Sequence, residues 1–228
     1  MQAIILAGGK GTRLIPITED FPKPLIKIDN ITLLERILQS LPAEIKEILI
    51  VIDYKGELIR EAFGNVYNDK NIMYILQEPM RGTYGALVSA KNYITSEKFL
   101  VMGADDIQDK DALEAMLRHT LSFGVHMQKL PKKNYLIVDI HSGIVRGMRR
   151  PTDIEFENLQ PMATGIYVFT NDIWNYPPVE VIEGEYGIPQ TIRPMLLDYD
   201  FKAIEMPHWI SINSHQELAS AERELKKR

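Results

Sequence analysis

The sequence predicts an α/β fold with a doubly wound, mixed and mainly parallel sheet, whose N-terminal half is Rossmann-like. Over the first 120 residues, short apolar runs typical of buried strands alternate with amphipathic helical segments. This alternation predicts βαβ units and a parallel sheet. After residue 120, short strand-like segments follow one another, two of them across a tight turn, which adds antiparallel strands to the sheet.

The first half is expected to contain four strands, each followed by a helix. The apolar runs that predict the strands lie at 3–7, 47–52, 71–76 and 99–102. The helices are expected from residue 33 onward, at 56–63, from about 84 to 93, and at 111–119. Thr32 and Glu35 have the spacing of a capping box, which indicates where the first helix begins.

The second half is expected to supply the remaining strands and a final helix. The strands are predicted at 123–130, 135–140, 144–148 and 163–169. Ser142 and Gly143 predict a tight hairpin turn, and Ser214 with Glu217 has capping-box spacing at the start of the last helix. Because no composition break separates the halves, we expect one domain over residues 1–228, with its halves at 1–120 and 121–228.

The composition is that of a soluble globular protein, with 45% hydrophobic and 25% charged residues. A net charge of −5 provides no basic field for nucleic acid or anionic lipid, so we expect neither as a partner. The absence of cysteine excludes disulfides, thiolate metal sites and a cysteine nucleophile. The apolar start at 1–6 is too short for a signal peptide or membrane span, and we expect a cytoplasmic protein.

The first loop after a predicted strand, GGKGTR at 8–13, combines three glycines with two cations. Glycines let backbone N–H groups turn towards an anion, and the cations add charge, so the loop is expected to hold phosphate. A dinucleotide fingerprint fails because Leu14 stands where a third glycine is needed, and a P-loop fails because Gly11 follows Lys10. Two further loops, at 77–83 and 103–109, are expected at the same carboxyl edge of the sheet.

Taken together, LAGGKGTRL at 6–14, Pro16, Thr18 and PKPL at 22–25 resemble the signature of the sugar-1-phosphate nucleotidyltransferases. The resemblance continues over nearly all of the chain. It implies the nucleotide-diphospho-sugar transferase fold, with a nucleotide-binding half at 1–120 and a sugar-phosphate-binding half with a C-terminal helix at 121–228.

The resemblance implies that the glycine loop and the segment after the third strand bind the nucleotide. The residues concerned are Leu6, Ala7, Gly8, Gly9, Lys10, Gly11, Thr12, Gln77, Gly82 and Thr83. Arg13 and Lys23 are the implied catalytic residues, which flank the α-phosphate and the leaving pyrophosphate. The Gln77 amide offers a donor and an acceptor to a base, Gly82 lets the ring approach, and Thr83 is also expected to cap a helix.

The loop after the fourth strand carries carboxylates, and oxygen ligands suit Mg²⁺. By the resemblance, Asp105 is the expected ligand of Mg²⁺, with Asp106 as its rival, while Asp109 is expected to cap the next helix or to face water. Asn213 is expected to supply the second oxygen ligand. Many members instead carry an aspartate at the position of Ser211.

The same resemblance implies a sugar-phosphate site formed by Arg150, Gly165 and Glu185. Gly165 lets the sugar ring pack against the backbone, Glu185 accepts hydrogen bonds from sugar hydroxyls, and Arg150 stands where members often have a lysine that touches the sugar phosphate. Gly187 and Pro189 depart from the family pattern nearby. These changes leave the identity of the acceptor open.

The implied reaction transfers a nucleoside monophosphate from an NTP to a sugar-1-phosphate, with Mg²⁺ assisting an in-line attack. The alternatives are a cytidylyltransferase acting on phosphocholine or a related phosphate monoester, and a non-catalytic regulatory subunit that senses nucleotide sugars. The aromatic side chains available to bind a choline group are Trp174, Tyr176, Tyr186 and Trp209. The chain ends soon after its last helix, so we expect none of the acetyltransferase β-helix that some relatives append. The nucleobase, the sugar and the oligomeric state stay open.

Overall fold

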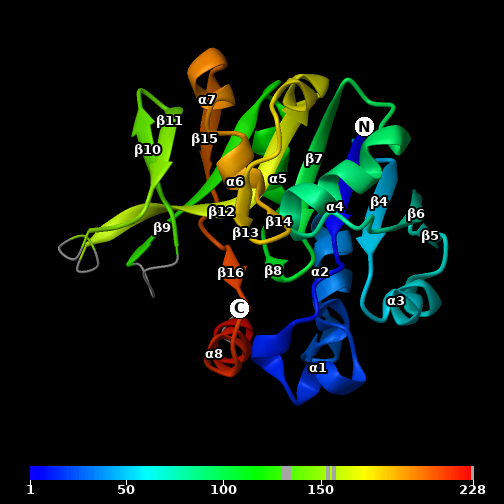
Figure 1. Ribbon diagram of the computed structural model, residues 1–228. Coiled ribbons are helices and arrows are strands. Elements are labelled where there is room, and N and C mark those ends of the chain that lie inside the picture. Colours follow the sequence, from blue (N-terminus) through cyan, green and yellow to red (C-terminus); the bar gives the residue numbers. More distant parts are fainter. Residues whose placement is uncertain (130–134, 153–154, 156–157, 227–228) are drawn as a thin grey trace.

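The computed structural model describes residues 1–129, 135–152, 155 and 158–226. A single ten-stranded sheet, to which both halves of the chain contribute strands, forms the centre of the protein (Figure 1). Its strand order is β10-β11-β15-β9-β12-β7-β1-β4-β6-β5. The fold is therefore mixed α/β, as the sequence predicts.

The N-terminal part of the sheet is parallel, because each strand is connected to the next by a helical crossover. Its strands are β1 (Gln2–Leu6), β4 (Glu47–Ile52), β6 (Lys70–Leu76) and β7 (Lys98–Gly103), with the short β5 (Val66–Tyr67) antiparallel at the edge. The helices between and after them are α2 (Leu33–Ser40), α3 (Gly56–Phe63), α4 (Gly82–Ala90) and α5 (Lys110–Leu117). The Thr32 hydroxyl accepts a hydrogen bond from Glu35 N at 3.1 Å, which confirms the predicted cap of α2.

The second part of the sheet is mostly antiparallel. Its strands are β9 (Ser122–Lys129), β10 (Ile137–His141), β11 (Ile144–Arg149), β12 (Leu159–Thr170) and β15 (Phe201–Glu205). The predicted hairpin turn between β10 and β11 is confirmed, and both Ser142 and Gly143 have positive φ there. The prediction missed β15, a short strand that lies between β11 and β9 and runs parallel to β9.

The remaining strands are short, and the remaining helices include α8 near the end of the chain. The remaining strands are β2 (Lys27–Ile28), β3 (Ile31–Thr32), β8 (Asp106–Ile107), β13 (Glu180–Ile182), β14 (Glu185–Tyr186) and β16 (Ile210–Ser211). The remaining helices are α1 (Ile17–Asp20), α6 (Ile188–Thr191), α7 (Met195–Asp198), α8 (His215–Leu225) and the 3₁₀ turns η1 (Thr12–Leu14), η2 (Lys23–Leu25), η3 (Lys91–Tyr93) and η5 (Asn171–Asn175).

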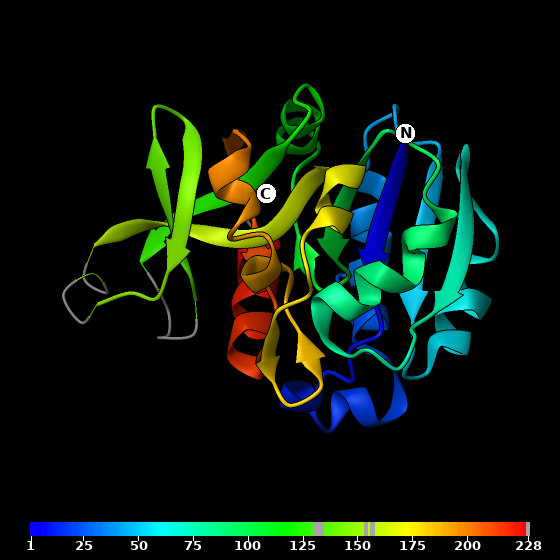
Figure 2. The ribbon, with the colours of Figure 1, turned by 45° about the horizontal axis from the view of Figure 1, so that its top comes forward.

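Apolar side chains cover both faces of the sheet, as a doubly wound fold requires. Along β1, Ala3 and Ile5 pack in one cluster with residues of α2, α3 and α5, whereas Ile4 packs in a second cluster with residues of α4, α6 and α7. Successive side chains of a strand point to opposite faces, which explains the division. Figure 2 shows helices on both sides of the sheet.

A third apolar cluster joins the two ends of the chain. Leu14 after the glycine loop, Ile28 of β2 and Ile107 of β8 pack with Ile212 and Leu218 at the start of α8. Burial of each such side chain stabilises by about 1.5–3 kcal/mol, so the cluster holds α8 firmly against the N-terminal segment. Figure 1 shows α8 beside α1. This contact decides which late residues reach the glycine loop.

Candidate active site

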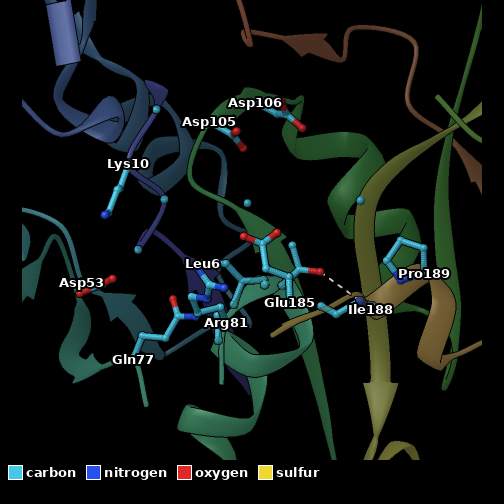
Figure 3. A pocket seen from close by; sticks show the side chains of 18 of the residues that line it. Leu6, Lys10, Asp53, Gln77, Arg81, Asp105, Asp106, Glu185, Ile188 and Pro189 are labelled. Atoms are coloured by element: carbon cyan, nitrogen blue, oxygen red, sulfur yellow. Dashed lines mark hydrogen bonds between the residues drawn. The ribbon is translucent and has the colours of Figure 1, made fainter. Parts of the chain in front are cut away.

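A cavity of about 690 Å³ lies at the carboxyl edge of the parallel strands (Figure 3). Its lining residues come from loops throughout the chain. They are Leu6, Gly8, Gly9, Lys10, Gly11, Thr12, Asp53, Gln77, Arg81, Gly82, Thr83, Ala86, Gly103, Asp105, Asp106, Thr164, Gly165, Tyr167, Glu185, Ile188 and Pro189. A neighbouring cavity of about 240 Å³ shares part of this lining and extends to Trp209 and Asn213.

The glycine loop forms one wall of the larger cavity, as predicted. Gly11 has φ +63°, and a Cβ there would lie 2.9 Å from Thr18 Cγ2, so the turn requires glycine. The Thr18 hydroxyl donates to the Gly11 carbonyl at 3.0 Å and fixes this turn. Ala7 is buried, and its N–H donates to Val51 O, so it extends the sheet without lining the cavity.

Lys23 is the cation that the fold holds most tightly near this loop. Its side chain is buried, with the residue 7% exposed, between Pro22 and Pro24. Its ammonium group donates to Asp105 Oδ2 at 2.6 Å and to Asn213 Oδ1 at 3.0 Å. Because a buried charge needs such partners, the two oxygens fix Lys23 at this place. Lys23 itself does not line either cavity.

Asn213 is oriented by three contacts of its own. Its N–H donates to Glu217 Oε2 at 2.6 Å, and its Nδ2 donates to the Ser211 hydroxyl. Arg13 Nη2 donates to Asn213 Oδ1 at 3.3 Å, which brings the second predicted catalytic cation to the same oxygen. Ser211 therefore contacts the amide nitrogen of Asn213, and it is the Asn213 oxygen that meets Lys23.

Asp106 differs from Asp105 in its surroundings. β8 pairs with β16, and Trp209 Nε1 donates to Asp106 Oδ2 at 3.2 Å. Burial, together with the negative charge of Asp105, raises the pKa of the Asp106 carboxyl well above its usual value. Asp106 Oδ2 is thus engaged by Trp209, whereas Asp105 Oδ2 meets the Lys23 ammonium group. Asp109 accepts from Ala112 N at 2.8 Å and caps α5, as expected.

Asp105 and Asn213 fit the chemistry of a Mg²⁺ site. Their oxygens converge on one cationic group, the Lys23 ammonium, and Mg²⁺ commonly takes only one or two protein oxygens beside water and substrate oxygens. Among the described residues, no group of three or more His, Cys, Asp or Glu side chains is arranged to hold a metal ion. A metal bound here would therefore depend on substrate phosphate for further ligands.

The segment after β6 contributes Gln77, Gly82 and Thr83 to the cavity. The expected helix cap by Thr83 is wrong: α4 begins at Gly82, two residues before the expected start, and Arg81 stands at its N-cap position. The Thr83 hydroxyl instead accepts from Ile188 N at 3.0 Å. The local sequence predicts a helix cap because threonine is favoured at N-cap positions. In the structure, the Thr83 hydroxyl accepts a hydrogen bond from a backbone N–H that is distant in sequence.

Gly82 is needed for contact between two segments of the protein. Its φ is +85°, and a Cβ there would lie 2.4 Å from Tyr186 O. Arg81 and Glu185 form a parallel bridge, and Tyr186 N donates to Arg81 O at 2.9 Å. The strand β14 thus lies directly against the start of α4, and this places Glu185 in the same cavity as Gln77.

Two of the three predicted sugar-phosphate residues line the cavity. Gly165 has φ +79° at a register shift between β12 and β9, so this part of β12 departs from regular pairing. Gly165 and Glu185 face the larger cavity, and Gly165 also lines the smaller one. Arg150 is exposed and lines neither cavity, so its role stays a prediction.

Several lining residues were missed by sequence reasoning. Asp53 and Arg81 are the charged ones, and Thr164 and Tyr167 come from β12. Asp53 directly follows β4, so the rule that ligands gather at the carboxyl ends of parallel strands could have found it. Thr164 and Tyr167 carry no comparable local signal.

The aromatic group considered for a choline acceptor is not assembled among the described residues. Trp174 stacks on Phe99, with ring centroids 6.2 Å apart, and the Tyr176 hydroxyl donates to Asp198 Oδ2 at 2.6 Å. Tyr186 contributes its backbone to the contact with Gly82. Of the four aromatic residues, Trp209 alone lines one of the two cavities.

Comparison with known proteins shows which family the chain belongs to. Residues 2–228 match the family described as nucleotidyl transferase. The chain belongs to this family. It is 30% identical, over its full length, to the bifunctional protein GlmU of Methanococcus aeolicus, of which it covers 55%. The chain thus spans about half the length of the curated relatives of this kind that it matches.

Two further comparisons concern one relative in sequence and one solved structure. The chain is 31% identical to the D-glycero-alpha-D-manno-heptose 1-phosphate guanylyltransferase of Campylobacter jejuni, with 77% of this chain and 78% of the relative aligned. The inositol-1-phosphate CTP transferase structure from T. maritima superposes with a TM-score of 0.77 at 18% identity, covering 99% of this chain and 95% of the other. This likeness shows a shared fold. No described helix of this family member is long and apolar enough to cross a membrane.

Proposed function

We propose that this nucleotidyl transferase family member transfers a nucleoside monophosphate from an NTP to a sugar-1-phosphate, giving a nucleotide sugar and pyrophosphate. One observation carries the proposal: a single cavity is lined by the glycine loop, by Gln77 and Gly82, and by Gly165 and Glu185, with Asp105 at its margin. A cavity that joins a phosphate loop to a polar acceptor side suits two phosphorylated substrates at once.

The reaction requires alignment and charge neutralisation more than proton transfer. A sugar-1-phosphate is largely dianionic at neutral pH, because its second pKa is about 6. One of its oxygens forms a bond with the α-phosphorus, while the bond from that phosphorus to the bridging oxygen of the β-phosphate breaks. The bonding pair leaves with pyrophosphate. No protein base is needed, which agrees with the residues available at the cavity.

Lys23 and Arg13 are the cations proposed to stabilise the charge that develops. Backbone N–H groups of the glycine loop and Lys10 would hold the β- and γ-phosphates, while Lys23 meets the α-phosphate. Arg13 can form two parallel bonds with phosphate oxygens. Lys23 is positioned before substrate arrives, because its buried ammonium group donates to Asp105 and Asn213. Arg13 is exposed and donates to the same Asn213 oxygen at 3.3 Å.

We propose Mg²⁺ as the cofactor, held by Asp105 and Asn213. When bound, the ion would neutralise phosphate charge and orient the reacting groups. Both substrates are small molecules, and neither nucleic acid nor membrane is proposed as a partner. A cytoplasmic location follows from the proposed reaction, since NTPs are supplied there.

The test is pyrophosphate release in a matrix of four NTPs against several sugar-1-phosphates and phosphocholine, with Mg²⁺ present. Lys23→Ala and Asp105→Ala are each expected to lower kcat at least about 10²-fold, as loss of a transition-state charge partner does. Lys27→Ala, at an exposed lysine of β2, is the control and should leave turnover unchanged.

Three outcomes would contradict the proposal. Near wild-type turnover of Lys23→Ala or Asp105→Ala would show that the reaction does not depend on the residue replaced. A preference for phosphocholine would favour the cytidylyltransferase alternative. Nucleotide-sugar binding with no pyrophosphate release in any combination would favour a regulatory subunit.

A further inference from the structure

Asp53 is a charged residue at the cavity for which the proposed phosphate chemistry has no use. It follows the last residue of β4 and lies beside the glycine loop, where a Cβ on Gly8 would be 3.2 Å from Asp53 Cβ. Across the described part of the chain, its carboxylate has no hydrogen bond or ion pair with another side chain. The carboxylate is exposed to the cavity and therefore available to a ligand.

Gln77 stands next to Asp53 at the end of the adjacent strand, β6. Figure 3 shows the two side chains on the same side of the cavity, away from Asp105 and Asp106. Gln77 Nε2 donates to Met80 O at 3.2 Å, and this bond orients the amide so that its Oε1 faces the glycine loop. A Cβ on Gly8 would lie only 2.6 Å from this Oε1, so glycine keeps the space open.

Asp53 and Gln77, with Gly8 between them, form an end of the cavity that lies away from Asp105 and Asp106 (Figure 3). The α-phosphate position proposed at Lys23 and Asp105 leaves the end formed by Asp53 and Gln77 for the nucleoside. That end presents two acceptors side by side, a carboxylate and an amide oxygen. A carboxylate is acceptor-only, so it selects a ligand edge rich in donors.

The bases differ in how many hydrogen-bond donors they present side by side. Guanine carries adjacent donors, N1–H and the 2-amino group, which can meet the two oxygens of a carboxylate in a bidentate contact. Uracil and thymine offer one N–H flanked by two carbonyl oxygens, which a carboxylate would repel. Adenine and cytosine present one amino group beside a ring acceptor. Guanine is the base that this edge satisfies best.

We propose that Asp53, with Gln77 beside it, is the residue that selects guanine, so that the NTP substrate is GTP. The proposal rests on the proposed function, since it assigns the base of the nucleotide that the same cavity would bind. It names one specificity-determining residue, Asp53, and one nucleotide substrate, GTP.

The test is direct binding, by calorimetry on the intact protein, of GTP, ITP, XTP, ATP, UTP and CTP. ITP lacks the 2-amino group and is the most informative comparison. GTP is expected to bind about 10- to 100-fold more tightly than ITP, the range for a lost hydrogen bond to a charged group, and more tightly still than UTP.

Asp53→Asn gives a change in specificity that misfolding cannot mimic. The amide keeps one acceptor for N1–H and gains a donor, which suits xanthine because xanthine has an oxygen at position 2. The variant is expected to lose about 10-fold or more in GTP affinity and to bind XTP more tightly than GTP. Asp29→Asn, the same charge change at an exposed turn between β2 and β3, should leave every affinity unchanged.

The outcomes separate this inference from the proposed function. If no NTP binds wild type, the proposed function and the inference both fail. If NTPs bind and pyrophosphate is released, but UTP, CTP or ATP is preferred or GTP and ITP bind equally, the guanine assignment alone fails. If Asp53→Asn lowered the affinity for all NTPs equally, the carboxylate would contact the ribose, and the guanine assignment would also be overturned.

Discussion

Replacing Gly82 with alanine tests whether the nucleotide and acceptor segments depend on one backbone contact. At φ +85° an alanine is strained, and its Cβ would lie 2.4 Å from Tyr186 O and 2.7 Å from Tyr186 N. Both atoms belong to backbone, so a side-chain rotation cannot relieve the overlap. Either α4 moves at its start or β14 moves away, with loss of the bond from Tyr186 N to Arg81 O.

The expected cost follows from these two effects. Left-handed backbone costs an alanine about 1–2 kcal/mol, and overpacking adds about 1–3 kcal/mol. A total of about 2–5 kcal/mol is a large share of the roughly 5–15 kcal/mol that stabilises a typical domain. Displacement of β14 also moves Glu185, so acceptor affinity should fall together with stability.

The assay is urea unfolding combined with the KM for each substrate. Gly9→Ala is the matched control for stability, since a Cβ at Gly9 has no heavy atom within 4 Å, and its unfolding free energy should change by less than about 0.5 kcal/mol. If Gly82→Ala matched this control in stability and kept the wild-type KM for the sugar phosphate, the inferred contact between α4 and β14 would be refuted.

Two further predictions concern charge. Arg149 donates two hydrogen bonds to Glu155 and lowers the pKa of this carboxyl group from 4.5 to about 2. The ionised carboxylate therefore stabilises the fold above pH 4.5, and this contribution is lost as the pH falls towards 2. Thermal unfolding should therefore show Glu155→Gln less stable than wild type near neutral pH and equal to it near pH 2; a pH-independent difference would contradict this. Asn213→Ala should raise the Mg²⁺ concentration for half-maximal pyrophosphate release by about 10- to 100-fold. Ser211→Ala should raise it by less, because Ser211 only orients the Asn213 amide. If neither variant changed the Mg²⁺ requirement, Asn213 would not be a metal ligand.

Much of the site could be predicted because its residues stand at the carboxyl ends of strands that the sequence marks clearly. The glycine loop, Gln77 and Asp105 each follow a short apolar run, and the strand β4 was predicted with its observed bounds. Such predictions need only local pattern and the rule that parallel strands end at one edge.

Other features depended on contacts that no local pattern encodes. The Thr83 hydroxyl accepts from Ile188, 105 residues further along the chain, so a sequence-based helix cap was wrong. The sequence pattern also gave no indication of β15. It pairs with β9 and β11, whose residues lie far away along the chain.

The sequence by itself determined which chemical groups the candidate site holds: glycines with cations after the first strand, carboxylates after the fourth, and the family signature that joins them. The tertiary structure decided which of these groups meet. Lys23 contacts Asp105 and Asn213, which are 82 and 190 residues away, because the apolar cluster of Leu14, Ile107 and Ile212 holds α8 against the glycine loop. Hydrophobic burial is non-directional, so it can bring distant segments together without leaving a local motif at the residues that it joins.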